Sequence, residues 1–462
     1  MLKIPRRIEA DQAPLSFAQQ RLWFLDLYEP NNSFYNFSSA FRLRGPLNIE
    51  ALERSLNEIT RRHEVLRTVV VTRDGQPIQI VEPYQYQSLL PLDLTALPAN
   101  QIDDEAMRLV AEEAGRPFDL ELGPLTRTTL LRLGVEDHVL LLTMHHIITD
   151  SWSIGILFRE LSALYPGFLS GAPTSLPELP IQYADFADWQ RRWLSGDLLE
   201  QQLHYWREQL RGVPPLLNLP TDRPRPVIGT TRGAHQSCVL PGTLSEAIRE
   251  LSREANATLF MTLLAAFQIL LQRYTGQDDL CVGTPIAGRR WPETQNLIGF
   301  FVNTLAIRGD MSGNPSFCEF LNSLRHTVLE AFSHQDVSFE QVVDMLAPVR
   351  DPSYAPLVQT MFVMQNRAGE SLSLPGISLS QMLPYSGQAK FDLALGVKDN
   401  LDGMTTILEY NADLFEAVTI DRMLNHFQTL LESIVANPNQ RLSELTLISE
   451  QEMRLLEEWG AA

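Results

Sequence analysis

The chain has little cysteine, no long apolar run and a deficit of positive charge. Its three cysteines among 462 residues are too few and too widely spaced for a disulfide framework, and none forms a Cys-x-x-Cys pair. The longest apolar run, around residues 258–271, carries Gln268 and is too short to span a bilayer. We therefore expect a cytoplasmic, globular protein with reduced thiols, no bound metal and no membrane partner.

The excess of acidic residues excludes one class of partner. The chain has 37 lysines and arginines against 56 aspartates and glutamates, a net charge of -19. Such a charge repels the phosphates of nucleic acid. The sequence also lacks a Gly-x-x-x-x-Gly-Lys phosphate loop and a Gly-x-Ser-x-Gly elbow. Small-molecule or protein partners remain, and nucleotide and Ser-His-Asp chemistry are disfavoured.

The length and composition indicate two lobes. A chain of 462 residues exceeds the roughly 100–200 residues of one ordinary domain. Strand-like and helix-like segments alternate, which indicates an α/β protein. Residues 170–180 are rich in proline and glycine and form the clearest linker. We predict an N-terminal lobe at 1–172, a second lobe at 173–444 and a connector at 445–462.

A pair of histidines stands at the end of an apolar strand. Residues 140–144 are followed by His145 and His146, and Asp150 comes four residues after the second histidine. A helical pattern follows at 153–165, and Pro166 should end it. The end of a strand that faces the start of a helix is a common place for chemistry in α/β proteins.

The doublet has four interpretations. A metal site would need both rings, but adjacent residues on a strand point to opposite faces. A nucleophilic triad would need a serine or cysteine partner, which the sequence does not mark. A buried structural pair is the default for an isolated doublet. An acid/base role fits if one ring holds the turn while its neighbour faces a cavity, because imidazole takes a proton near neutral pH.

Three further residues are candidates for the same site. Asp150 stands at a helix start, where a carboxylate is more often an anchor than a base. We expect an arginine as its partner, with Arg289 as the first choice and Arg62 as the second. Asn303 lies in the strand-like run 298–304. It is either a satisfied buried amide or a donor that faces the substrate, and the spacing leaves both open.

At this point the residues carry a resemblance to a known family. The His-His-x-x-x-Asp pattern after an apolar strand resembles the signature of nonribosomal peptide synthetase condensation domains, in the chloramphenicol acetyltransferase-like superfamily. All seven motifs of that family have similar stretches here, in family order across nearly the whole chain. They are Ser16–Trp23, Arg62–Thr68, Met144–Ser153, Tyr183–Trp189, Ile298–Thr304, His334–Glu340 and Arg350–Ser353.

The resemblance implies a fold and an activity. It implies two chloramphenicol acetyltransferase-like lobes that form a V-shaped pseudo-dimer with a tunnel between them. Upstream donor and downstream acceptor carrier proteins would bring substrates on phosphopantetheine arms, and the domain itself would bind no cofactor. The reaction would be peptide-bond formation in the biosynthesis of an antibiotic or other secondary metabolite, most like the subtype that joins two L-residues. Residues 445–462 would start the linker to a following adenylation domain.

The resemblance also assigns roles to residues. His146 would be the central catalytic residue, within a motif that includes His145 and Asp150. Asn303 and the turn residues Ser151 and Trp152 would line the substrate site.

One position departs from the family pattern. The family usually has glycine after the aspartate, and this chain has Ser151. Serine costs on the order of 1 kcal/mol if the position needs a positive φ, but it is well suited if it caps a helix that begins at Trp152. A serine hydroxyl in the site would suit a variant that dehydrates or modifies the bound residue. A copy that only recruits a tailoring enzyme is a further alternative.

Overall fold

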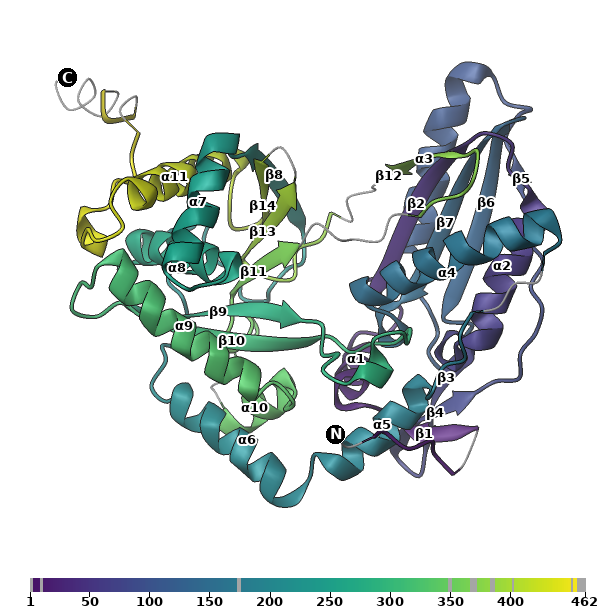
Figure 1. Ribbon diagram of the computed structural model, residues 1–462, viewed down its shortest axis with the longest axis horizontal. Helices are drawn as coiled ribbons and strands as arrows, with labels where there is room; N and C mark the ends of the chain where they lie inside the picture. The colour runs from purple at the N-terminus through teal and green to yellow at the C-terminus, as the bar shows by residue number, and fades with distance from the viewer. Residues whose placement is uncertain are drawn as a thin grey trace. The chain divides into compact units, whose positions relative to one another are not determined.

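The computed structural model describes residues 3–8, 11–172, 176–347, 351–365, 372–382, 387–400, 403–449 and 452–454. Their contacts divide the chain into two compact units (Figure 1). Unit 1 comprises residues 1–196, 287–302 and 369–386, and unit 2 comprises residues 197–286, 303–368 and 387–462. Each unit contains helices and at least one sheet, so the predicted α/β class with two lobes is confirmed.

Unit 1 has a five-stranded sheet in the order β12-β2-β7-β6-β5 and a three-stranded sheet in the order β1-β4-β3. Its strands are β1 (Gln12–Pro14), β2 (Asn36–Arg44), β3 (Thr68–Arg73), β4 (Gln76–Val81), β5 (Leu92–Asp93), β6 (Thr126–Gly134), β7 (Asp137–His145) and β12 (Ser378–Met382). Its α-helices are α1 (Phe17–Tyr28), α2 (Ile49–Arg62), α3 (Ala99–Gly115), α4 (Ser151–Ser170) and α5 (Tyr183–Trp193). Short 3-10 turns lie at Glu64–Arg67, His146–Ile148 and Pro292–Thr294.

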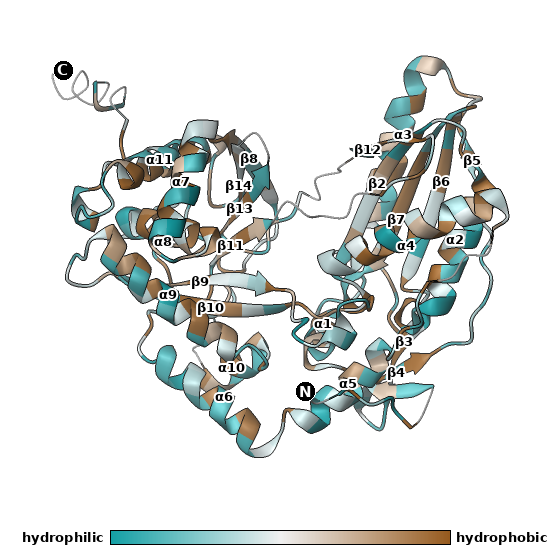
Figure 2. Ribbon diagram, in the orientation of Figure 1, coloured by the Kyte–Doolittle hydropathy of each residue, from teal (hydrophilic) through white to brown (hydrophobic). Residues whose placement is uncertain are grey.

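The central strand of unit 1, β7, is buried on both faces. Leu140, Leu142 and Met144 pack with α2 and α4, whereas Val139 and Leu141 pack with α3. This alternation follows from the period of two in a strand. Figure 1 shows α2 and α4 side by side, and Figure 2 shows β2 and β7 as mostly hydrophobic. The strand that ends in the histidine doublet is therefore held from both sides.

Unit 2 has a six-stranded sheet in the order β10-β9-β11-β13-β14-β8. The strands are β8 (Gly233–Val239), β9 (Asp279–Ile286), β10 (Asn303–Asp310), β11 (Thr360–Gln365), β13 (Leu393–Asn400) and β14 (Gly403–Asn411). The helices are α6 (Gly196–Gln209), α7 (Gly242–Glu254), α8 (Leu259–Thr275), α9 (Phe317–Ser333), α10 (Phe339–Leu346) and α11 (Ala417–Ala436), with a 3-10 turn at Leu442–Glu444. Figure 1 shows α7, α8, α9 and α11 on one side of this sheet.

The structure differs from the predicted boundary at 172/173. The stretch after the proline-rich segment stays in unit 1 up to Gly196, because α5 is tied to residues near the N-terminus. Asp185 on α5 accepts a hydrogen bond from Arg7 Nη1 at 2.7 Å. Segments 287–302 and 369–386 also make their contacts in unit 1, although their neighbours in sequence belong to unit 2. Composition marks a linker but does not reveal which unit its neighbours contact.

The end predicted for the helix after the doublet is also wrong. Helix α4 continues through Pro166 to Ser170 and ends at Gly171, which has a φ of 69°. A proline inside a helix removes one backbone donor, and here the surrounding helix is retained. Glycine in the left-handed conformation is the usual stop, so Gly171 ends the helix.

Some predictions fall outside the described residues, namely Arg350 of the seventh motif and residues 450, 451 and 455–462 of the expected connector. Among the described residues, no single helix is long and apolar enough to cross a membrane. Helices α7 and α8 meet that test of length and composition only together, across a bend of 106°.

Candidate active site

The first histidine of the doublet is a structural residue of the turn. His145 is the last residue of β7, and its ring is buried. Its Nδ1 accepts a hydrogen bond from the backbone N–H of Ile147 at 3.1 Å, so in the neutral ring Nε2 carries the proton. The rings of Tyr35 and Phe118 lie 6.4 and 6.1 Å from it. His145 therefore caps the short turn that leads toward α4.

The second histidine has the opposite tautomer. His146 Nδ1 lies 2.7 Å from the carbonyl oxygen of Thr149. Because a carbonyl oxygen only accepts, Nδ1 donates and carries the proton, and the lone pair of the neutral ring is on Nε2. The backbone N–H of His146 donates to the carbonyl of Tyr35 at 2.7 Å. The ring is half-buried, whereas that of His145 is buried. His146 is thus the member of the pair with chemistry suited to a base.

Asp150 is the cap of α4 and is completely buried. Its Oδ1 accepts from the backbone N–H of Ser153 at 2.8 Å and lies 2.7 Å from Ser153 Oγ. Its Oδ2 accepts from the backbone N–H of Phe301 at 3.1 Å. Arg289 Nη2 donates to the same carboxylate, at 3.0 Å from Oδ1 and 3.2 Å from Oδ2. The carboxylate joins the start of α4 to segment 287–302 of the same unit.

The structure shows Arg289 as the partner of Asp150. The side chain of Arg289 is 2% exposed, and its Nη1 donates to the carbonyls of Thr294 and Leu297, both at 2.6 Å. Its guanidinium lies 4.1 Å from the centre of the Phe301 ring. Burial lowers the pKa of the Arg289 guanidinium, although the charge of Asp150 acts in the opposite direction. The pair is a buried ion pair whose other polar atoms are largely satisfied by backbone groups.

Arg62, the second choice for that role, binds a different carboxylate. Its Nε lies 3.0 Å from Glu160 Oε1, and its Nη2 donates to the carbonyl of Pro177. His63 Nε2 lies 3.0 Å from the other oxygen of Glu160. Burial alone would raise the pKa of Glu160, but the hydrogen bonds and charges of His63 and Arg62 hold that pKa below its ordinary value. The prediction that Arg62 could pair with Asp150 is wrong.

The two turn residues after Asp150 are exposed. Ser151 is the first residue of α4, and it does not have a positive φ. The position therefore does not require glycine for its backbone conformation, and the helix cap is Asp150 rather than Ser151. Trp152 is 49% exposed, and its indole N–H donates to the carbonyl of Gln295 at 3.0 Å. Trp152 thus also contacts segment 287–302.

Of the two roles that the sequence left open for Asn303, the structure supports the satisfied amide. Its Nδ2 donates to the carbonyls of Gln335 and Val337 at 3.0 and 2.7 Å. Its Oδ1 accepts from the backbone N–H groups of Thr304 and Phe339 at 2.9 and 3.0 Å. Because both amide protons and both lone pairs are used within unit 2, the expectation of a substrate-facing donor is not supported.

Two more residues contribute to the site; both lie in the family-like stretches, but the sequence patterns assign neither of them a role. Ser153 Oγ lies within 3.0 Å of Asp150, of Arg289 Nη2 and of both backbone polar groups of Gly299. The buried Tyr183 hydroxyl donates to the carbonyl of Phe300 at 2.6 Å and lies 2.8 Å from Ser16 Oγ. Ser153 stands three residues after the cap, a spacing typical of an N-terminal capping partner. The contacts of Tyr183 are long-range and leave no local signal.

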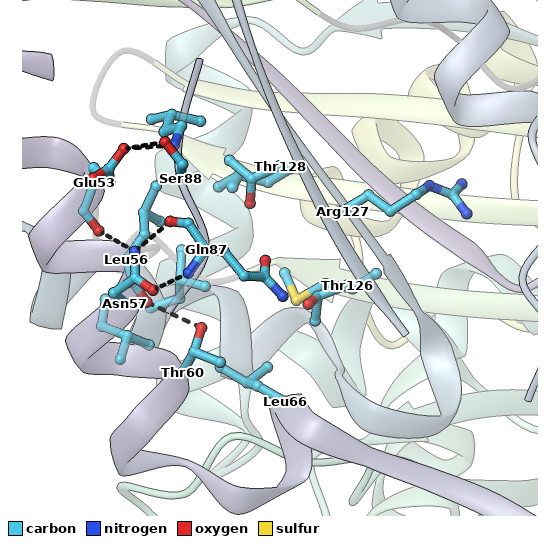
Figure 3. Close-up of a pocket in the computed structure, with 15 residues that line it drawn as sticks. Glu53, Leu56, Asn57, Thr60, Leu66, Gln87, Ser88, Thr126, Arg127 and Thr128 are labelled. Carbon is cyan, nitrogen blue, oxygen red and sulfur yellow. Dashed lines mark hydrogen bonds between the residues drawn. The ribbon is translucent and has the colours of Figure 1, made fainter. Parts of the chain in front are cut away.

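A small cavity lies beneath β7, away from the histidine rings. It has a volume of about 70 Å³, and Met144 and Leu142 line it together with α2 and residues 87–89 (Figure 3). Glu53 and Asn57 of α2 hold residues 87–89 in place through hydrogen bonds to Ser88 and Gln87, respectively. Neither histidine lines the cavity, and it is too small for a carrier-bound substrate. In the described part of the chain, no group of three or more His, Cys, Asp or Glu side chains is placed to hold a metal ion.

Comparison with known sequences identifies the family. The profile described as "Condensation domain" matches residues 9–457. One of the subunits of linear gramicidin synthase from Brevibacillus parabrevis is 48% identical over 97% of this chain, which covers 6% of that protein. Phosphinothricin tripeptide synthetase PhsC of Streptomyces viridochromogenes is 46% identical over 99% of this chain, which covers 42% of that protein. The chain thus spans less than half the length of these relatives.

Comparison with solved structures agrees with the family. The X-domain from teicoplanin biosynthesis is 28% identical with a TM-score of 0.87, over 97% of this chain and 100% of that chain. The first condensation domain of the calcium-dependent antibiotic synthetase is 20% identical with a TM-score of 0.76, over 95% of this chain and 100% of that chain, which supports the fold alone. The predicted chloramphenicol acetyltransferase-like fold is confirmed. The chain belongs to the condensation-domain family of nonribosomal peptide synthetases, whose members form peptide bonds.

Proposed function

We propose that this domain joins a donor acyl thioester to an acceptor aminoacyl thioester, both on phosphopantetheine arms, with His146 Nε2 as the proton acceptor. The amine nitrogen attacks the thioester carbonyl carbon, so that a C–N bond forms and the C–S bond breaks. The proton passes from nitrogen to Nε2 and then to the departing thiolate. An aminoacyl amine titrates at about 8, so part of it is already neutral near pH 7. The base therefore acts on the proton that becomes acidic as the C–N bond forms.

The tautomer of His146 is the observation that carries this proposal. Its Nδ1 donates to the Thr149 carbonyl at 2.7 Å, which directs the lone pair of the neutral ring to Nε2. Because a backbone carbonyl only accepts, this bond favours a proton on Nδ1 both when Nε2 carries a proton and when it does not. Holding two tethered substrates beside such a base could supply much of the acceleration.

We assign Asp150 and His145 to the architecture of the motif rather than to proton transfer. The Asp150 carboxylate already accepts from Ser153, Phe301 and Arg289, which uses the lone pairs that a base would need. His145 is buried with its Nδ1 bound to the backbone of the turn. Ser151 and Trp152 begin the helix beside this turn, and we propose that they border the bound substrate.

The proposed partners follow from the family. We propose that an upstream donor and a downstream acceptor carrier protein deliver the substrates. The phosphopantetheine cofactor would be attached to these carriers, and this domain would bind no cofactor of its own. We further propose that residues 445–462 begin the connector to a following adenylation domain. Within the described part of this connector, Glu452 contacts helix α11 of unit 2: its Oε1 lies 3.2 Å from His426 Nε2. We propose the cytoplasm as the location.

A reconstituted condensation assay tests the proposal. Two carrier proteins are loaded with model aminoacyl groups, and the dipeptidyl carrier is followed by intact-protein mass spectrometry. We expect product with the wild type, loss of product with His146→Ala, and normal product with His204→Ala, which changes an exposed histidine on α6. A product lighter by one water would instead support the dehydrating variant suggested by Ser151.

A second candidate function is recruitment of another enzyme. A complex of the X-domain and OxyB from teicoplanin biosynthesis has been solved, and that X-domain has a TM-score of 0.87 to this chain at 29% identity. A domain of this fold therefore can hold a partner enzyme. Carrier binding without product, across several well-matched pairs of carriers, would favour this role and exclude the catalytic one.

A further inference from the structure

We propose that Phe300 is a positioning residue for His146, assisted by Phe37, and that its ring keeps Nε2 pointed in one direction. The inference rests on the proposed role of His146 as the proton acceptor. It assigns a function to two aromatic side chains that do not themselves take part in bond formation.

The geometry around the imidazole carries this inference. The centre of the Phe300 ring lies 5.0 Å from that of His146, with an interplanar angle of 67°. The Phe37 ring lies 6.0 Å away, at 78°. Both pairs have the spacing and near-perpendicular orientation of edge-to-face aromatic contacts. The half-buried imidazole is thus packed against two rings.

Ring packing adds to the hydrogen bonding that orients the ring of His146. The bond from Nδ1 to the Thr149 carbonyl restrains one edge of the imidazole. Rotation about the bond between Cβ and the ring is soft, because such torsions have broad minima. A half-turn would replace Nδ1 by a carbon atom at the carbonyl and would move Nε2 away from its present direction. Two rings packed against the imidazole oppose that rotation.

Phe300 is itself held by the buried polar groups of the motif. Its carbonyl accepts from the Tyr183 hydroxyl at 2.6 Å, and the N–H of the next residue, Phe301, donates to Asp150 Oδ2 at 3.1 Å. Arg289 in turn binds Asp150. This chain of contacts gives the Asp150–Arg289 pair an effect on the reaction: it fixes the backbone that presents the Phe300 ring to His146.

Glycine at position 299 allows the close approach that this arrangement needs. A methyl group there would lie 2.0 Å from the Tyr183 ring. Gly288, at the start of the same segment, has a φ of 63°, and a methyl group there would lie 2.0 Å from the carbonyl oxygen of Phe301. Both ends of the segment are therefore fitted closely to their neighbours in unit 1.

The test compares Phe300→Leu with Phe41→Leu. Both changes remove a buried phenyl ring from unit 1, but Phe41 packs against Phe158 of α4 rather than against His146. Condensation kinetics are measured together with the ¹⁵N shifts of the imidazole nitrogens in histidine-labelled protein, assigned with His146→Gln. We expect Phe300→Leu to lower kcat by about 10- to 100-fold and to leave KM for the acceptor carrier within about twofold. The two His146 nitrogen shifts should move toward the average of the two tautomers.

Three further variants keep the test decisive. Tyr183→Phe keeps its ring but releases the Phe300 carbonyl, and it should lower kcat in the same direction by less. Phe37→Leu serves if Phe300→Leu does not fold, and Phe37→Tyr should restore most of the activity because the ring returns. Unchanged His146 shifts in Phe300→Leu, with a kcat equal to that of Phe41→Leu, would overturn the inference. Absence of dipeptide with the wild type would instead remove the proposed function, while the nitrogen shifts still report on positioning.

Discussion

Helix α4 takes part in two clusters that each contain a histidine, an arginine and a carboxylate. The first cluster has Asp150 at the helix cap, bound to Arg289, with His146 four residues earlier. The second has Glu160, about three turns further along, bound to Arg62 and His63. All these side chains belong to unit 1. Residue types alone do not distinguish the two clusters.

The clusters differ in the group that holds the histidine. In the second cluster, His63 Nε2 binds Glu160 and Nδ1 accepts from the N–H of Ile298 at 3.4 Å, in a ring that is 1% exposed. In the first cluster, the carboxylate binds other donors and a backbone carbonyl holds the half-buried His146. A histidine engaged by a carboxylate at one nitrogen and a peptide N–H at the other is a structural part. The bond from His146 Nδ1 to a backbone carbonyl places the basic lone pair of the neutral ring on Nε2.

Replacing each histidine by alanine should separate these roles most strongly. His146→Ala is expected to lower kcat by about 10²- to 10⁴-fold, because general-base catalysis contributes on that order. His63→Ala is expected to cost about 2–4 kcal/mol of unfolding free energy through the buried space and the lost hydrogen bond. Urea unfolding and single-turnover condensation measure the two effects. A stable, inactive His63→Ala variant would contradict the comparison.

Removing each arginine should give two losses of stability of different size. Arg289→Met leaves Asp150 buried without its cation, which we expect to cost about 3–5 kcal/mol of stability. Arg62→Met leaves Glu160 with His63 and should cost about 1–2 kcal/mol. Thermal unfolding of both variants under identical buffer conditions measures the order. Equal losses would indicate that the Asp150 carboxylate finds another partner.

The Glu160 cluster should also contribute to acid sensitivity. Because the folded protein holds the pKa of Glu160 below its ordinary value of 4.5, the carboxylate stabilises the fold at any pH above that value. This contribution is lost as the pH falls below 4.5 and through the lowered pKa. Glu160→Gln should therefore show a shallower loss of stability than the wild type in urea titrations over the acid range. Glu112→Gln, on the exposed surface of α3, should retain the wild-type slope.

Much of the fold around the doublet could be predicted from local patterns. The apolar run 140–144 lies in β7, and the helical pattern at 153–165 lies within α4. These features depend on residues a few positions apart. The family was predicted from the order of seven short stretches, and the condensation-domain profile that matches residues 9–457 confirms it.

The long-range contacts of the site were predicted only in part: Arg289 was expected as the partner of Asp150, whereas the contact of Tyr183 with Phe300 was not expected. Arg289 is 139 residues from Asp150, and Tyr183 is 117 residues from Phe300. No periodicity connects such residues. The predicted boundary at 172/173 is wrong for the same reason, because α5 contacts residues near the N-terminus: Asp185 is 178 residues from its partner Arg7. For Asn303 too, the local pattern was not enough, because it could not distinguish a fully hydrogen-bonded amide from one that donates to a substrate.

The smallest effect should come from the one residue that departs from the family motif. Ser151 is exposed at the first position of α4 and does not have a positive φ, so glycine relieves no strain there. We expect Ser151→Gly to change the unfolding free energy by less than about 1 kcal/mol, the cost of glycine in a helix. Condensation with model aminoacyl carriers should stay within about threefold of the wild type. A dehydrated product that disappears in Ser151→Gly would instead assign the hydroxyl to chemistry, because the structure gives it no backbone task that glycine could not perform.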